Sequence, residues 1–158
     1  MAEAYDVVIV GGGVSGASLA YILREYTNVG KIVVLEKEEE IACVNSHRNN
    51  NSQTLHFGDI ETNYTFEKAK SVKRSADLVK HFLIQHDKKK TVHSKYTKMV
   101  LAVGDTQVEK LKKRSDEFIK LFPENKFIGK KEIGKYEPNV LKGRDKKENI
   151  AAFFSEDG

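Results

Sequence analysis

The chain has 158 residues, of which 27 are lysine or arginine and 23 are aspartate or glutamate, giving a formal net charge of +4. Its single cysteine excludes an internal disulfide framework and a cysteine-rich zinc site. The apolar fraction of 39% is too high for wholesale disorder, yet no apolar run approaches the ~20 residues that a membrane-spanning helix needs. Because the first residues also lack the basic start of a signal peptide, the sequence predicts a soluble, cytoplasmic protein.

Charge is distributed unevenly along the chain. Residues 1–65 carry four basic and nine acidic side chains, whereas residues 66–158 carry 23 basic and 14 acidic ones. A basic surface of this kind can attract anionic lipid or nucleic acid. Since there is no zinc finger, RNP motif or basic region with heptads, we expect no nucleic-acid partner and interpret the lysines as a solvated surface.

The first forty residues predict a βαβ unit. Residues 5–10 form a continuous β-branched apolar run, which is typical of a strand buried on both faces of a parallel sheet. Helical spacing of small and apolar residues follows and ends near Gly30, and residues 31–36 then form a second apolar run. We expect a right-handed crossover between the two strands.

The remaining elements follow a long polar loop over residues 37–65, and a loop of that length is usually functional or disordered. In chain order, the pattern predicts a helix over 66–86, a strand over 97–104, a helix capped by Asp105 or Thr106 and stopped by Pro123, a short helix over 130–136 and a strand over 150–154. The sequence stops directly after the last strand. We therefore expect that strand to lack a neighbour, which indicates an interrupted chain.

A glycine-rich turn separates the first strand from the first helix. Gly11-Gly12-Gly13-Val14-Ser15-Gly16 fits the pattern G-x-G-x-x-G. Gly11 permits a tight turn, Gly13 lets the backbone approach a pyrophosphate, and Gly16 lets the helix pack closely on the strand. In this context the motif predicts a dinucleotide site.

The other expected contacts of the nucleotide lie on both sides of the unit. The helix N-terminus at Val14 and Ser15 offers N–H groups to the phosphates. Glu36, with Lys37 beside it, closes the second strand 20 residues after Gly16, where a carboxylate can accept hydrogen bonds from ribose hydroxyls. A carboxylate there argues against NADP. Spacing alone leaves FAD and NAD open, and the long loop favours FAD, which needs a further segment to line the flavin.

The loop itself carries a second motif. Asn51-Ser52-Gln53-Thr54-Leu55-His56-Phe57-Gly58 matches an Asn-Ser-x-x-x-His-x-Gly pattern. Its short amides and hydroxyls suit phosphate and flavin recognition, although they are also ordinary turn residues. With this motif and Asn63-Tyr64-Thr65, the sequence resembles the N-terminal portion of the malate:quinone oxidoreductases, within the FAD-dependent amino acid and 2-hydroxy acid oxidoreductases.

Two later stretches are similar to the same family. Met99–Gly104 followed by Val108–Arg114 resembles its strand, glycine and helix block, and Glu137–Asp145 resembles its Pro-x-Val-x-x-Gly-Arg-Asp signature. The sequence departs from the family at Ser52-Gln53-Thr54, where many members carry a glycine-rich segment.

The resemblance implies a flavoprotein of the tricarboxylic acid cycle that oxidises (S)-malate to oxaloacetate and passes electrons to quinone at the inner face of the cell membrane. It places FAD against the loop at Asn51, Ser52, Gln53 and Thr54. His56 becomes the candidate catalytic group near the flavin. Arg144 becomes a candidate clamp for a substrate carboxylate, unless it is held by contacts within its own turn.

The expected fold is α/β, with a Rossmann-like FAD-binding βαβ unit and flavin-lining loop in residues 1–65. Residues 66–158 are expected to begin a mixed α+β substrate domain that is incomplete at its C-terminus. Within the loop, Glu61 and Tyr64 are expected to organise the backbone. No metal site is expected, and oligomeric state is left open.

Two alternatives remain open. One is another FAD-dependent 2-hydroxy acid dehydrogenase, for example one that acts on 2-hydroxyglutarate. The other is a non-catalytic fragment with at most weak nucleotide binding, because members of the family continue well beyond residue 158. We expect the 158-residue chain alone to lack malate oxidation activity.

Overall fold

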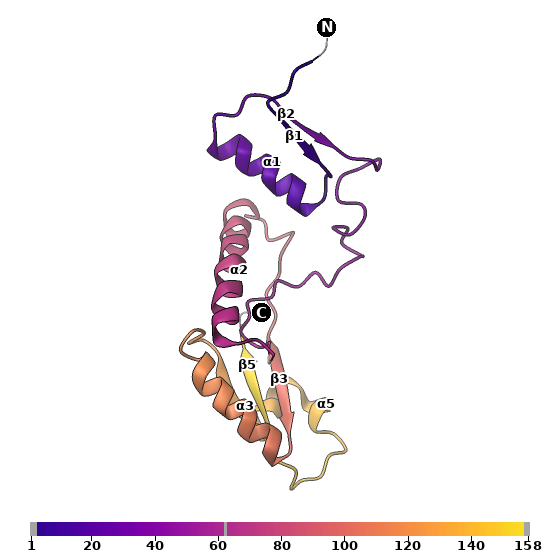
Figure 1. Cartoon of the computed structure of the whole chain (residues 1–158). Coiled ribbons are helices and arrows are strands. Elements are labelled where there is room, and N and C mark those ends of the chain that lie inside the picture. Colours follow the sequence, from indigo (N-terminus) through magenta and orange to yellow (C-terminus); the bar gives the residue numbers. More distant parts are fainter. Residues whose placement is uncertain (1–2, 62, 157–158) are drawn as a thin grey trace. The chain divides into compact units, whose positions relative to one another are not determined.

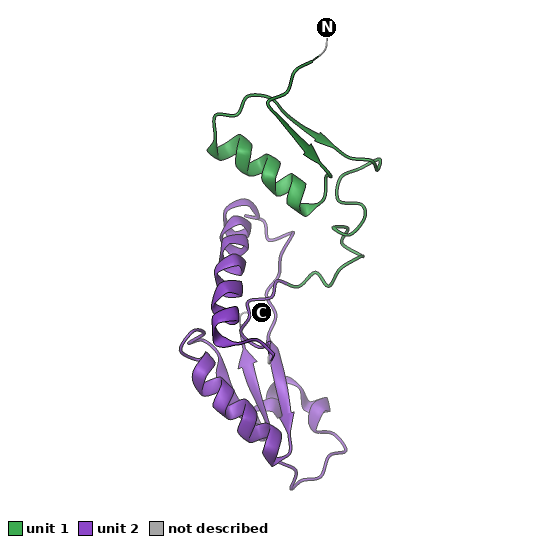
Figure 2. Cartoon of the chain, in the orientation of Figure 1, with its two compact units in different colours: residues 1–54 green, residues 55–158 purple. Residues whose placement is uncertain are grey.

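The computed structural model describes residues 3–61 and 63–156, and the chain folds as two compact units, residues 1–54 and 55–158 (Figure 2). The division lies earlier in the chain than the boundary expected after residue 65. That expected boundary was placed by function, at the end of the presumed flavin-lining loop, and it stays a prediction.

The first unit is a βαβ arrangement, as predicted (Figure 1). It consists of β1 (Val7–Val10), α1 (Val14–Tyr26) and β2 (Ile32–Leu35). The two strands pair in parallel, with Val7 opposite Ile32 and Val10 opposite Leu35. α1 packs against both strands.

The expectation that β1 is buried on both faces is wrong for the described chain. Ile9 is 6% exposed, whereas Val8 is 54% and Val10 84% exposed. Successive side chains of a strand point to opposite faces, and burial of both faces needs a layer on each. In this unit α1 is the single covering layer among the described residues, so one face of the strand remains open.

In the part of the second unit that the structure describes there are four helices and an antiparallel sheet. In chain order its elements are α2 (Phe66–His86), β3 (Lys98–Val103), α3 (Asp105–Phe118), β4 (Lys126–Gly129), α4 (Lys130–Tyr136), α5 (Pro138–Leu141) and β5 (Ile150–Ser155). The Thr65 hydroxyl caps α2 by accepting from the N–H of Lys68 at 3.2 Å. The expected cap of α3 differs: Gly104 occupies the N-cap without a side-chain hydrogen bond.

The expectation that β5 lacks a neighbour is also wrong. The strand order is β3-β5-β4, so β5 is the central strand, paired on both sides. Phe153 lies opposite Val100 of β3 and opposite Phe127 of β4. The missing neighbour was an artefact of chain order, because β4 was not predicted and both partners of β5 precede it in the sequence.

Two hydrophobic clusters hold this sheet, one on each face. The first joins side chains of α2, α3 and β5, including Ala69, Phe118 and Phe153. The second joins α4, β4 and β5, including Ile133 and Phe154. Neighbouring residues of β5 therefore contribute to opposite clusters, and every residue of the strand is buried.

Candidate functional site

The glycine-rich turn has the backbone geometry that its motif predicts. Gly11 has a φ of +98°, in the left-handed region that favours glycine. A Cβ atom on Gly16 would lie 1.9 Å from the carbonyl oxygen of Gly11, so a larger residue there must displace α1 from β1. The N–H of Gly11 also donates to the carbonyl of Leu35 at 2.7 Å, which ties the turn to β2.

The N-terminus of α1 lies directly beside this turn. Gly13 is its N-cap and provides no side-chain cap, and the first turn contains no acidic residue. Instead, the N–H of Val14 donates to Oγ of Ser46 at 2.9 Å. Ser46 thus supplies an oxygen at the position where a phosphate oxygen would accept, a contact that the sequence did not reveal.

The Glu36 carboxylate is fixed by backbone N–H groups. Oε2 accepts from Gly12 at 2.7 Å, and Oε1 accepts from Lys37 at 2.8 Å and Glu38 at 3.2 Å. The hydrogen bond from Gly12 is the main reason that the pKa of Glu36 lies below its ordinary value, with smaller contributions from Glu38 and Lys37 that outweigh partial desolvation.

These groups meet at one pocket of about 250 Å³ in the first unit. Its lining residues are Gly13, Glu36, Lys37, Ala42, Cys43, Val44, Asn45 and Ser46. It combines a bare glycine, the positive end of a helix and a carboxylate at the end of β2. This donor and acceptor set fits the pyrophosphate and ribose of a dinucleotide.

The four polar residues expected to contact the flavin make their described hydrogen bonds within their own loop. Nδ2 of Asn51 donates to the carbonyls of Asn45 at 3.2 Å and His47 at 3.1 Å, and its Oδ1 accepts from the N–H of Gln53 at 3.0 Å. The Thr54 hydroxyl donates to the carbonyl of Ser52 at 3.0 Å. These contacts give the loop a defined shape, and its contact with a flavin stays a prediction.

In the second unit, His56 is paired with Glu61. Nδ1 of His56 lies 2.8 Å from Oε1 of Glu61. Nη2 of Arg114 donates to the carbonyl oxygen of Glu61 at 2.9 Å and to that of Tyr64. Burial lowers the pKa of Arg114, opposed by the neighbouring charge of Glu117. Sequence reasoning missed Arg114 as the anchor, since fifty positions separate it from Tyr64.

His56 also borders a pocket of about 280 Å³ along one side of α2. The pocket is lined by Leu55, His56, Lys68, Ser71, Val72, Ser75, Ala76 and Val79. The lining thus includes one lysine and two serines together with apolar residues; Nζ of Lys68 lies 5.9 Å from the centre of the Tyr64 ring, and the Ser75 hydroxyl donates to the carbonyl of Ser71. Such a mixture can bind a small carboxylate.

Arg144, the candidate clamp, does not line this pocket. Its Nε donates to the carbonyl of Val140 at 2.7 Å, and Nη1 pairs with Oε2 of Glu148 at 3.0 Å. The guanidinium is thus engaged within its own segment, by Val140 and Glu148. Its role toward a substrate stays a prediction.

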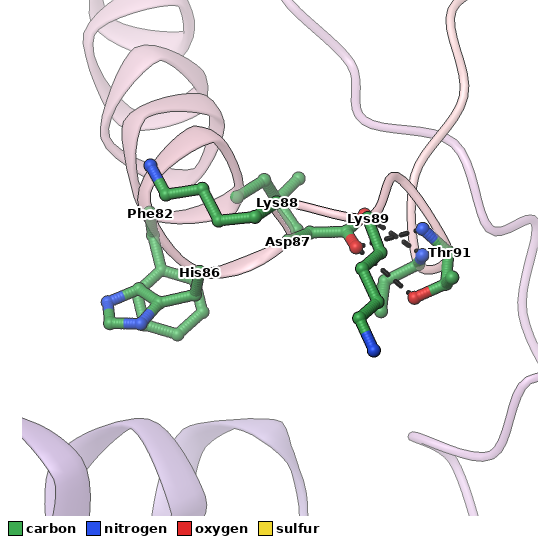
Figure 3. A pocket seen from close by; sticks show the side chains of 8 residues that line it. Phe82, His86, Asp87, Lys88, Lys89 and Thr91 are labelled. Atoms are coloured by element: carbon green, nitrogen blue, oxygen red, sulfur yellow. Dashed lines mark hydrogen bonds between the residues drawn. The ribbon is translucent and has the colours of Figure 1, made fainter.

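The pocket in Figure 3 lies at the C-terminal end of α2 and is shaped by a buried carboxylate. Oδ1 of Asp87 accepts from the N–H and hydroxyl of Thr91, and Oδ2 accepts from the N–H groups of Val92 and His93 and contacts Nδ1 of His93 at 2.7 Å. No residue predicted for the site lines this pocket. The carboxylate therefore stabilises the turn after α2 by accepting from its backbone N–H groups.

The described part of the chain contains no group of three or more histidine, cysteine, aspartate or glutamate side chains that could hold a metal ion. Among residues 3–61 and 63–156, no helix has both the length and the apolar character that a membrane crossing requires.

The parallel β1–β2 pair with α1 between its strands, and the separate antiparallel sheet, make this a mixed α/β protein. The sequence model of the family described as "Malate:quinone oxidoreductase (Mqo)" matches residues 3–158. The chain belongs to the malate:quinone oxidoreductase family, which confirms the resemblance to its N-terminal portion.

Curated relatives carry the same description. The chain is 46% identical to the probable malate:quinone oxidoreductase of Campylobacter jejuni, over 99% of this chain and 36% of the relative. It is 39% identical to the malate:quinone oxidoreductase of Helicobacter pylori, over 95% of this chain and 34% of the relative. It is 30% identical to the probable malate:quinone oxidoreductase of Neisseria gonorrhoeae, over 100% of this chain and 36% of the relative. The chain thus spans about a third of the length of these relatives.

Proposed function

We propose that this chain is the FAD-binding portion of an enzyme that oxidises (S)-malate to oxaloacetate and passes the electrons to membrane quinone. The names of its relatives supply malate and quinone. The observation that carries the proposal is the pocket where Gly13, the N-terminus of α1 and Glu36 meet. That arrangement binds the part of a dinucleotide common to FAD and NAD, and the polar loop after β2 favours FAD.

Each part of FAD has an assigned set of residues. The N–H of Ser15 would hold the pyrophosphate together with that of Val14, which would exchange its hydrogen bond to Ser46 for one to a phosphate oxygen, and Glu36 would hold the ribose hydroxyls. The segment from Asn51 to Thr54 would lie along the flavin ring. When bound, FAD supplies the acceptor for the hydride that leaves malate.

The side chains proposed to accept the substrate proton and to bind the substrate carboxylate lie in the second unit. Malate must lose its hydroxyl proton as it is oxidised, and His56 is the proposed acceptor because its ring is half exposed at the edge of a pocket. Lys68 in the same pocket offers a positive charge to a carboxylate, as Arg144 does in its own segment.

We propose peripheral attachment at the inner face of the cell membrane, where quinone is reached. The basic character of residues 66–158 supports this, since each well-placed lysine or arginine contributes about 1 kcal/mol of attraction to an anionic surface. Membrane association that is insensitive to salt would contradict this part of the proposal.

The test is a chimera in which residues 1–158 replace the matching third of the Campylobacter jejuni relative. We expect it to bind FAD and to reduce a quinone analogue with malate in preference to 2-hydroxyglutarate or lactate. Changing His56→Ala should lower the malate-dependent rate at least about 100-fold, which is the scale of a lost general base. His81→Ala is the matched control and should leave the rate unchanged. A folded chimera without FAD, or one that prefers another hydroxy acid, would contradict the proposal.

The 158-residue chain by itself is proposed to lack malate oxidation and to bind nucleotide weakly, because it spans about a third of its relatives. A purified chain that is yellow and reduces quinone with malate would overturn this.

A further inference from the structure

The pairing of His56 with Glu61 has an asymmetry that bears on the proton chemistry of the imidazole. Nδ1 of His56 lies 2.8 Å from Oε1 of Glu61. The His56 side chain is 57% exposed, whereas that of Glu61 is 15% exposed. The Glu61 carboxylate is therefore largely buried, whereas the imidazole ring of His56 is accessible to solvent.

The partner of Nδ1 decides which ring nitrogen carries the proton. A carboxylate has acceptor atoms only, so Nδ1 of His56 must donate and therefore carries the proton in the neutral ring. Nε2 then keeps a free lone pair. This is the tautomer that a proton acceptor at the open end of the ring requires.

The backbone of Glu61 is held in place from α3. Nη2 of Arg114 donates to the carbonyl oxygens of Glu61 and Tyr64, and the Arg114 guanidinium lies 4.1 Å from the centre of the Phe118 ring. The N–H of Tyr64 also donates to the carbonyl of Glu61 at 3.1 Å. The backbone of this turn is thus fastened without any contribution from the Glu61 carboxylate.

The Glu61 carboxylate makes its hydrogen bond to His56 alone among the described residues. Its other oxygen, Oε2, is buried and has no partner in that part of the chain. A buried acceptor without a donor is costly. A glutamate that merely tied the loop together would be expected to use both oxygens, so the arrangement indicates a task directed at the imidazole.

We propose that Glu61 is a positioning residue for His56, which fixes the proton on Nδ1 and leaves Nε2 as the acceptor. This deepens the proposed function and rests on it for the use of Nε2; the tautomer is a property of the chain alone. In the reaction the hydroxyl O–H bond of the substrate breaks and the proton bonds to Nε2. Glu61 remains a carboxylate and stabilises the imidazolium that forms.

The experiment uses the 158-residue chain with ¹⁵N-labelled histidine and records two-bond ¹H–¹⁵N correlations, whose pattern distinguishes a ring that carries its proton on Nδ1 from one that carries it on Nε2. Spectra are compared for the unaltered chain, Glu61→Ala, the volume-retaining Glu61→Gln, and Glu67→Ala as a control on the first turn of α2. His93 is an internal reference, because its Nδ1 faces Asp87 in the same way.

We expect His56 to carry its proton on Nδ1 in the unaltered chain and in Glu67→Ala. In Glu61→Ala the ratio of tautomers should shift toward Nε2–H by roughly tenfold or more, the scale of a lost charge-assisted hydrogen bond. Glu61→Gln should give a mixture, because an amide can either donate to Nδ1 or accept from it. His93 should be unchanged throughout, which shows that the second unit remains folded.

An Nε2–H tautomer of His56 in the unaltered chain, or the same tautomer ratio with and without Glu61, would overturn the inference. If the His93 signals change in Glu61→Ala, the inference is judged from the His56 tautomer ratio in Glu61→Gln instead. None of these results depends on FAD, malate or quinone. Failure of the proposed function would instead appear as a folded chimera without FAD or malate oxidation.

Discussion

A Cβ atom on Gly16 would lie 1.9 Å from the carbonyl oxygen of Gly11, far inside any real contact distance. Gly11 lies in the turn that follows β1, and Gly16 lies in the first turn of α1. Their close approach brings the helix N-terminus to the edge of the parallel sheet, where Glu36 also lies.

Changing Gly16→Ala should therefore destabilise the first unit by about 1–3 kcal/mol, because the methyl group must push α1 away from a backbone oxygen. The free energy of unfolding is measured from urea denaturation followed by circular dichroism. Gly129→Ala is the matched control, since a Cβ atom there would meet nothing within 4 Å. Equal stability of the two variants would show that α1 does not pack as described.

Changing Glu36→Gln should weaken binding of 5′-AMP about tenfold, through loss of the charged acceptor for ribose hydroxyls. The same change should narrow the preference of the chain for 5′-AMP over adenosine 2′,5′-bisphosphate, whose 2′-phosphate the carboxylate repels. Both are measured by nucleotide titration followed by NMR. Glu38→Gln is the control, because its carboxylate pairs with Lys37 in solvent. If Glu36→Gln and Glu38→Gln titrate alike, the ribose assignment fails.

The stability of the turn after α2 should depend on acid through Asp87. Burial raises the pKa of Asp87, but the N–H groups of Val92, Thr91 and His93 and the His93 ring outweigh it and hold the pKa well below its ordinary value of 3.8. A carboxyl whose folded pKa is depressed stabilises the fold fully above its ordinary value and loses that contribution as the pH falls through the folded value.

The unfolding free energy of the unaltered chain should thus exceed that of Asp87→Asn at about pH 5, and the difference should shrink steadily toward about pH 2. Asp77→Asn is the control, because Asp77 forms a partly exposed pair with Lys73 on α2. A difference that stays constant over this range would mean that the N–H groups do not stabilise the carboxylate.

Breaking the ion pair between Lys98 and Asp59 should be costly, because their side chains are only 18% and 4% exposed and Nζ lies 2.7 Å from Oδ1. Lys98→Met should lower the unfolding free energy by about 3–5 kcal/mol, since it leaves the buried Asp59 carboxylate, which also accepts from the Asn125 amide at 3.3 Å, without its countercharge. Lys126→Met removes an exposed pair with Glu156 and should change little. If urea denaturation shows similar losses of unfolding free energy for both variants, the pair between Lys98 and Asp59 is not buried as described.

The first unit could be predicted from sequence because its determinants are local. The glycine-rich turn fixes where β1 ends and α1 begins, and Glu36 follows at a set distance. α2 was predicted with its observed ends, because its apolar spacing is regular and Thr65 caps it.

β4 was missed for the opposite reason. Its four residues, Lys126–Gly129, are too few to show a period, and they form a strand because Phe127 and Ile128 pair with β5. The same distant pairing placed β5 in the centre of the sheet. Local spacing predicts the existence of a strand, but its neighbours depend on the whole topology.

The candidate site was predictable to a similar extent. Sequence reasoning identified Gly13, Glu36 and His56 from their motifs. It missed two contacts beside these residues, the one between Ser46 and the N–H of Val14 and the one between Arg114 and the carbonyl of Glu61. These contacts join residues 32 and 53 positions apart, and neither serine nor arginine is unusual where it stands.

The central position of β5 has a consequence for the order of events during synthesis. β3 and β4 leave the ribosome first, and neither pairs with the other; each awaits Ile150–Ser155. Until those six residues emerge, both strands carry open hydrogen-bonding edges, and neither hydrophobic cluster has its central layer. A pause in translation ahead of Ile150 would therefore leave β3 and β4 of the nascent chain without their common neighbour.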